Sequence, residues 1–302
     1  MVNYTYNDVI TSLSEKLSQS GFENAQWEAR ELAGAALGFN CRGPFDGKKQ
    51  ADTSQVKLSA QMLARRLSGE PLQYIIGEWD FYGETFEVGR GVLIPRADTE
   101  TLIDEALRLM GGRKDIKAAD LCAGTGCIGI TAERLLDCAE MYCVEKYDAA
   151  KVYLDRNIKR HNSKVISVQG DVLLQDTADR LPQLDLIISN HPYINAEDME
   201  HLQKEVTFEP ETALEGGEDG YDFYRGIVRI WSKKLAPDGV MIFEIGAGQE
   251  DEVMQIMIQA GLKDVRVRKD MAGIDRCVFG RRVESRTVNL YDELEKRNNR
   301  KE

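Results

Sequence analysis

The sequence has no pair of cysteines spaced as C-x-x-C, although it contains six cysteines in all. Zinc sites and redox motifs commonly use that spacing, so we predict neither a metal site nor a disulfide framework. Scattered cysteines of this kind are typical of small buried side chains in a reducing cytosol.

Basic residues are also scarce, because 39 Lys and Arg face 51 Asp and Glu, which gives a formal net charge of −12. A protein that binds nucleic acid through its phosphates needs a basic surface, so direct nucleic-acid binding is not expected. No apolar run approaches the roughly 20 residues of a membrane-spanning helix, and the start of the chain lacks the pattern of a signal peptide. We therefore predict a cytoplasmic protein without a membrane partner.

The chain does contain enough residues, 302, for two modest domains. Residues 1–70 predict a small helical bundle, because apolar residues recur at helical spacing. Residues 71–97 alternate aromatic and polar residues between glycines, which predicts a β-hairpin linker. Residues 98–282 alternate short apolar strands with helices, which predicts an α/β domain with a parallel sheet and an antiparallel edge. Residues 283–302 form a charged tail with a weak helical stripe.

The stretch Ile116–Glu145 has the pattern of a nucleotide-binding unit. An apolar strand ends in the loop Cys122–Gly126, and a helix and a second strand ending on Glu145 follow. Glycines at 124, 126 and 129 satisfy G-x-G-x-x-G, which lets the backbone approach a ligand at a helix N-terminus. A carboxylate about 20 residues further on suits ribose hydroxyls. This pattern alone fits either a nicotinamide cofactor or S-adenosylmethionine.

A second motif, Ser189-Asn190-His191-Pro192-Tyr193, follows the apolar strand Leu184–Ile188. Ligands of open α/β sheets bind beyond the carboxyl ends of the strands, so this turn should face the same crevice as the glycine loop. Asn190 offers a hydrogen-bond donor and an acceptor, and Pro192 stiffens the turn. A hydride-transfer enzyme needs an acid or base here, and this turn is not an obvious one.

This turn resembles that of amino-methyltransferases dependent on S-adenosylmethionine, which carry (Asn/Asp/Ser)-Pro-Pro-(Tyr/Phe) after strand four. The runs FYGETFEVGRGVLIPRADTE, FEPETALEGGEDGYDFYRGI, FEIGAGQ and VRKDMAGIDRCVFGRR further resemble release-factor glutamine methyltransferases of the HemK/PrmC type. The resemblance covers most of residues 70–282. It implies a Rossmann-like, seven-stranded class I methyltransferase domain behind an N-terminal helical substrate-recognition domain. The implied activity is methylation of the glutamine amide in the Gly-Gly-Gln motif of class 1 peptide-chain release factors.

The resemblance also implies roles for individual residues. The Asn190 side-chain oxygen and the His191 carbonyl would accept the two N–H bonds of the target amide, while Tyr193 packs on its plane beside Pro192. An amide nitrogen is a poor nucleophile because its lone pair is delocalised, so such positioning would replace a general base. The residues implied to bind the cofactor are Asp120, Cys122, Ala123, Gly124, Thr125, Gly126, Glu145, Asp171, Val172 and Asn190. Among these, Glu145 would bind ribose, and Asp171 with Val172 would lie by the adenine.

Two departures from the family pattern leave alternatives open. His191 stands where the family usually has proline, which removes the fixed φ, and we expect its neutral imidazole to point to solvent or to the Thr207–Pro210 loop. Cys122 and Ala123 stand where glycine and threonine are frequent. The alternatives are a ribosomal-protein glutamine methyltransferase, an adenine amino-methyltransferase, a nicotinamide oxidoreductase and a non-catalytic cofactor-binding protein.

Overall fold

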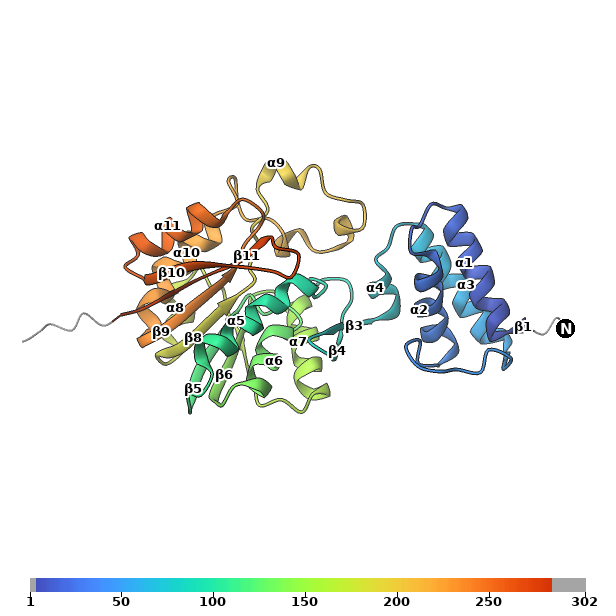
Figure 1. The fold of residues 1–302 in the computed structure, drawn as a ribbon, viewed down its shortest axis with the longest axis horizontal. Helices are drawn as coiled ribbons and strands as arrows, with labels where there is room; N and C mark the ends of the chain where they lie inside the picture. Colours follow the sequence, from blue (N-terminus) through green and yellow to red (C-terminus); the bar gives the residue numbers. More distant parts are fainter. Residues whose placement is uncertain (1–3, 284–302) are drawn as a thin grey trace, which may run out of the picture.

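The computed structural model describes residues 4–283, so the tail predicted for 283–302 lies almost wholly outside the described residues. A helical part at the N-terminus and a larger α/β part are connected by a short hairpin (Figure 1). No helix within residues 4–283 is both long and apolar enough to cross a membrane. All six cysteines are free, three of them buried and three half-buried.

The N-terminal part is a bundle, as its helical spacing predicts. Its elements are β1 (Tyr4–Thr5), α1 (Tyr6–Gln19), α2 (Ala25–Leu37), β2 (Gln50–Ala51), α3 (Thr53–Leu67) and α4 (Leu72–Ile76). One cluster of buried apolar side chains joins α1, α2 and α3 and extends into α4 through Leu72 and Ile75. Helix α4 occupies part of the segment interpreted as a hairpin linker. Five residues are too few to display a helical repeat, which explains why the pattern missed it.

The hairpin itself follows α4. Its strands are β3 (Glu78–Phe81) and β4 (Glu84–Glu87), which pair antiparallel. Tyr82 and Gly83 connect them, and both have positive φ, at 52° and 78°. A two-residue connection with positive φ at both positions matches the right-handed twist of the paired strands. Phe81 and Phe86 point into the core of the α/β part, so the hairpin is anchored there.

The α/β part contains a seven-stranded sheet in the order β10-β11-β9-β8-β5-β6-β7. Its strands are β5 (Ile116–Leu121), β6 (Cys138–Glu145), β7 (Ile166–Gln169), β8 (Leu184–Ser189), β9 (Leu235–Glu244), β10 (Lys263–Lys269) and β11 (Asp275–Arg281). Strands β5 to β9 are parallel, whereas β11 is antiparallel to both of its neighbours. The predicted Rossmann-like sheet with an antiparallel edge is therefore confirmed.

Helices cover both faces of this sheet. They are α5 (Glu100–Met110), α6 (Cys127–Leu135), α7 (Asp148–Arg160), α8 (Gln175–Asp179), α9 (Ala196–Met199), α10 (Asp222–Trp231) and α11 (Glu250–Gln259), with 3-10 turns at Ala97–Thr99, Val206–Phe208, Glu211–Ala213 and Ser232–Lys234. Successive residues of β5 face opposite sides, so Ala118 belongs to one buried cluster and Ala119 to the other. Both faces are buried, which accounts for the continuously apolar strands.

The order of the strands fixes where a ligand can bind. The chain runs outward from β5 through β6 to β7 and then returns to the opposite side of β5 as β8. The sheet therefore has a topological switch point between β5 and β8, where loops diverge and leave a crevice. The glycine loop follows β5 and the Asn190 turn follows β8, so both lie at this point.

Candidate active site

The glycine loop between β5 and α6 contains three residues with left-handed φ, and two of them are glycines. Gly124 has φ +54° and borders a cavity at the carboxyl ends of the strands. Gly126 has φ +81° and precedes α6, and a Cβ there would lie 2.5 Å from Leu154 on α7. The left-handed φ favours glycine at both positions, and the closeness of Leu154 leaves no room for a side chain at Gly126. The motif therefore forms a tight strand-to-helix turn, and Gly124 of this turn borders the cavity.

Cys122 explains one departure from the family pattern. It has φ +64°, a left-handed conformation in which glycine is unstrained and other residues are disfavoured. Its side chain borders the same cavity as Gly124. Burial raises the pKa of the thiol, and the nearby Glu145 carboxylate raises it further, so the group stays uncharged and is not a nucleophile.

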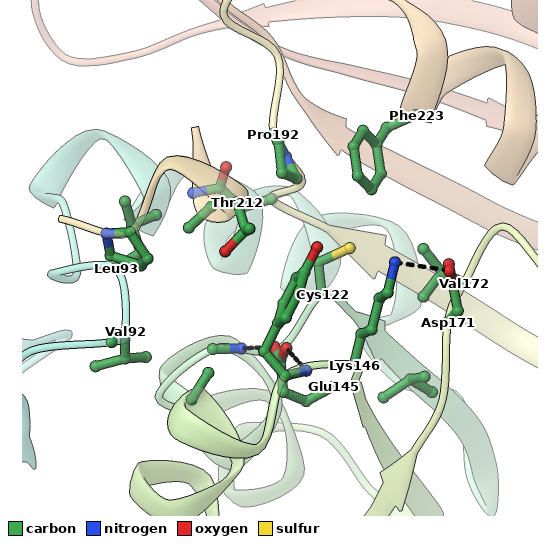
Figure 2. A pocket seen from close by; sticks show the side chains of 18 of the residues that line it. Val92, Leu93, Cys122, Glu145, Lys146, Asp171, Val172, Pro192, Thr212 and Phe223 are labelled. Atoms are coloured by element: carbon green, nitrogen blue, oxygen red, sulfur yellow. Dashed lines mark hydrogen bonds and ion pairs between the residues drawn. The ribbon is translucent and has the colours of Figure 1, made fainter. Parts of the chain in front are cut away.

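Glu145, at the end of β6, ties the loop to the cavity. Its Oε2 accepts the N–H of Gly124 at 2.9 Å and its Oε1 accepts the N–H of Tyr147 at 2.8 Å. Figure 2 shows this carboxylate on one side of the cavity and Pro192 and Phe223 on the opposite side. Each carboxylate oxygen has a second lone pair, so Glu145 can still accept hydroxyl donors from a ligand.

This strand-end cavity is mostly apolar with charged groups on one wall. Its empty space is about 640 Å³ when the open mouth is included. Asp171 and Lys146 form an ion pair at 2.9 Å on the wall, and Val172 lies beside them (Figure 2). The predicted site residues that border the cavity are Cys122, Gly124, Glu145, Asp171, Val172, Asn190 and Pro192.

The remaining predicted cofactor residues do not border the cavity. Ala123, Thr125 and Gly126 are absent from the cavity wall, and the first two are almost fully buried. Asp120 is completely buried, and its Oδ2 accepts the N–H of Gly129 at 2.9 Å. Burial raises the pKa of Asp120 to about 8. Its position supports the first turn of α6 and offers no direct contact with a ligand in the cavity.

The expectation that His191 points to solvent or to the Thr207–Pro210 loop is wrong. The side chain is 1% exposed and lies among the rings of Phe223, Tyr224 and Phe243. Its Nδ1 lies 3.2 Å from the hydroxyl oxygen of Ser189. Burial lowers its pKa to about 3, so the imidazole is neutral. Aromatic packing thus immobilises the residue that stands where proline is usual.

Asn190 lies where two cavities meet. The second, which we call the loop cavity, is bordered by the segment 194–214 and by Pro71 and Gln73 next to the bundle. Only Leu93, Asn190 and Ala213 border both cavities. Tyr193 borders the loop cavity alone. A ligand in each cavity would therefore meet at the Asn190 side chain.

Sequence reasoning missed three residues that support this site. Glu244, at the end of β9, accepts the hydroxyl protons of Thr99 at 2.5 Å and Tyr193 at 3.1 Å. Thr99 is the N-cap residue of α5, but its side chain makes no capping hydrogen bond. Asn157 on α7 donates to the carbonyl of Thr125 in the glycine loop at 2.9 Å. The one signal available in the sequence was Glu244, a carboxylate at the end of an apolar strand in the FEIGAGQ run.

Comparisons with known proteins agree with this architecture. Residues 8–77 match the family described as PrmC N-terminal domain, and residues 99–218 match the methyltransferase small domain. A solved methyltransferase structure from Pyrococcus furiosus has a TM-score of 0.50 at 18% identity, covering 74% of this chain and 100% of that chain. At that identity, the likeness supports the fold alone.

Curated relatives are more informative. A release factor glutamine methyltransferase from Geobacter sulfurreducens is 38% identical over 282 residues, which cover 92% of this chain and 97% of that protein. One of the same name from Thermodesulfovibrio yellowstonii is 35% identical over 83% of this chain and 91% of its own length. The chain therefore belongs to the release factor glutamine methyltransferase family.

Proposed function

We propose that this protein transfers a methyl group from S-adenosylmethionine to the glutamine side-chain amide in the Gly-Gly-Gln motif of class 1 peptide-chain release factors. The observation that carries the proposal is the position of Asn190, whose side chain borders both cavities. One cavity would hold the methyl donor and the other the glutamine. The cytoplasm is the predicted location of this reaction.

The strand-end cavity fits the cofactor by the chemistry of its wall. Glu145 would accept the ribose hydroxyls, Val172 and Asp171 would lie by the adenine, and the backbone at Gly124 would approach the methionine part. The wall opposite Glu145, which includes Pro192 and Phe223, is mostly apolar and suits a flat aromatic base. When bound, S-adenosylmethionine supplies a methyl group on a positively charged sulfur.

The glutamine amide nitrogen is a poor nucleophile, and the Asn190 turn would promote its reaction by orienting it toward the methyl donor. The Asn190 oxygen and the His191 carbonyl would accept the two amide protons, which aims the glutamine nitrogen at the donor cavity. Tyr193 would pack on the plane of the amide from the loop cavity. Holding two reactants in one geometry can supply ~7–11 kcal/mol of the barrier. The nitrogen would lose a proton to water after transfer.

The direct test is incubation with methyl-labelled S-adenosylmethionine and a purified release factor. We expect label on the Gly-Gly-Gln glutamine and none on a release factor in which that glutamine is replaced by asparagine. A ribosomal protein or an adenine-containing nucleic acid labelled instead would overturn the proposed substrate. Cofactor binding without any transfer would overturn the proposed activity.

A first variant tests the acceptor role. We expect Asn190→Ala to lower kcat at least 100-fold, because one of the two acceptors that orient the amide is lost. The dissociation constant for S-adenosylmethionine, measured by calorimetry, should change less than about tenfold, since most of that wall is intact. A variant that keeps the wild-type kcat would contradict the positioning mechanism.

A further inference from the structure

A buried hydrogen-bonded chain leads from strand β9 to the Asn190 side chain. Glu244 is 2% exposed, and its Oε2 accepts the hydroxyl proton of Thr99 at 2.5 Å. Thr99 is also 2% exposed, and its Oγ1 accepts from the Nδ2 of Asn190 at 3.1 Å. The other carboxylate oxygen of Glu244 accepts from the Tyr193 hydroxyl at 3.1 Å. One carboxylate therefore reaches both Asn190 and Tyr193, at the two ends of the turn.

The chain has a defined direction. An ionised carboxylate can only accept hydrogen bonds, so the single hydroxyl proton of Thr99 points to Glu244. Thr99 can then only accept from Asn190, which requires the NH₂ end of that amide to face it. Turning the amide by 180° would bring two acceptor oxygens together and lose the hydrogen bond. Among the described residues, no donor occupies the Asn190 oxygen.

We infer that Thr99 and Glu244 are positioning residues that orient the Asn190 amide so that its oxygen is presented to the incoming glutamine. This inference rests on the proposed function for the role of Asn190. Glu244 also accepts a hydrogen bond from the Tyr193 hydroxyl, so it fixes the turn at Tyr193 directly and at Asn190 through Thr99. Together with the packed His191 ring, these hydrogen bonds supply the rigidity that a proline at position 191 would give.

The kinetic test removes the hydroxyl of Thr99 and keeps the shape of its side chain. Thr99→Val should lower kcat about tenfold, with KM for cofactor and for release factor changed less than twofold. Thr99→Ser keeps the hydroxyl and should restore kcat to within twofold of wild type. Thr131→Val is the matched control, because Thr131 is also buried, on α6, and its hydroxyl has no hydrogen-bond partner among residues 4–283. Unchanged kcat in Thr99→Val would overturn the inference.

A double-variant comparison shows whether Thr99 acts through Asn190. A serine at position 190 has no amide group to orient and is too short to reach Thr99. In an Asn190→Ser background, Thr99→Val should therefore change kcat less than twofold. An equal loss of kcat in both backgrounds would mean that Thr99 supports the fold generally, and it would overturn the inference.

A readout independent of activity separates this inference from the proposed function. Asparagine-selective ¹⁵N labelling gives the side-chain amide signals, and Asn190→Ser identifies the one from Asn190. We expect its proton shift to move upfield in Thr99→Val and to stay in Thr99→Ser. An unmoved signal in Thr99→Val would overturn the orientation. A moved signal in a protein that labels no release factor would preserve the orientation and overturn the substrate.

Discussion

The protonation state of Glu244 should affect kcat. Burial raises its pKa to about 6, although Thr99, Tyr193 and Arg276 favour its charged form and Asp98 opposes it. Protonated Glu244 could donate to Thr99, which would then no longer be restricted to accepting from Asn190. We expect kcat to fall as the pH decreases through about 6, and to fall much less steeply in Glu244→Gln. Initial rates between pH 5 and 8 test this.

The effect of the same group on stability has the opposite sign. Because the folded pKa of Glu244 lies above its ordinary value of 4.5, its stabilising contribution is present at low pH and is lost as the pH rises through about 6. A loss of rate below pH 6 therefore cannot come from unfolding caused by Glu244. Melting temperatures recorded in the same buffers serve as the control, and equal pH profiles for both proteins would contradict the prediction.

The effect of a substitution at Cys122 on stability should depend strongly on the residue introduced. Its φ of +64° suits glycine and is strongly disfavoured for a β-branched residue. We expect Cys122→Val to lower the free energy of unfolding by about 2 kcal/mol more than Cys122→Gly. Urea titrations of the two variants give this difference. If valine were tolerated as well as glycine, the left-handed conformation at this position would be wrong.

Individual residues were only partly predictable from the sequence. Glu145 and Asn190 follow strands whose ends could be recognised, and both border the cavity as expected. His191 was misplaced because its burial depends on three aromatic rings that are distant in the sequence. Thr99 was missed because its partner Glu244 is 145 residues away. Local rules fail where long-range contacts build a site.

At the scale of elements, Asn157 joins three segments that are far apart in the sequence. Its side chain on α7 accepts from the Glu87 N–H at 2.7 Å and donates to the Glu87 carbonyl at 3.0 Å. It also donates to the carbonyl of Thr125 in the glycine loop at 2.9 Å. The residue is fully buried, so these partners have no alternative in water. The hairpin and the loop therefore share one anchor.

Replacing this anchor should destabilise the fold. We expect Asn157→Leu to lower the free energy of unfolding by about 3 kcal/mol, because buried backbone groups lose their partner. Lys159→Ala, on the exposed face of the same helix, should cost less than about 0.5 kcal/mol. Both values come from urea unfolding. Similar losses in the two variants would mean that α7, and not this anchor, limits stability.

Most helices and strands could be predicted from the sequence, but the order in which the strands pair could not. The helical bundle predicted for residues 1–70 was recognisable because apolar residues recur there at helical spacing. Helix α4 was missed because it is one turn long. The insertion of β11 between β9 and β10 was not predicted either, since the order of strands follows from pairing across the sheet and not from local pattern.

At the scale of the whole molecule, Arg66 links the bundle to the α/β part. It is 3% exposed, and it pairs with Glu28 at 2.5 Å and with Glu205 at 2.6 Å. Its guanidinium also lies over the ring of Phe22. Glu28 belongs to the bundle, whereas Glu205 belongs to the segment that borders the loop cavity. One buried cation therefore holds the two parts together beside the proposed substrate site.

The two pairs should differ in their contribution to stability. We expect Arg66→Met to lower the free energy of unfolding by about 3–5 kcal/mol, because Glu28 would be left buried and unpaired. Glu205→Gln should cost less than about 1 kcal/mol, since its side chain is 48% exposed. Chemical denaturation of both variants measures the difference. Equal losses would show that the pair with Glu205 is as important as the pair with Glu28.

The three residues shared by the two cavities also bear on the order of events in a catalytic cycle. Leu93, Asn190 and Ala213 border both cavities, and every other lining residue borders only one of them. Under the proposed function, the cofactor and the release factor would therefore bind against largely separate walls. We expect the cofactor to exchange while the release factor stays bound, and we expect either reactant to be able to bind first.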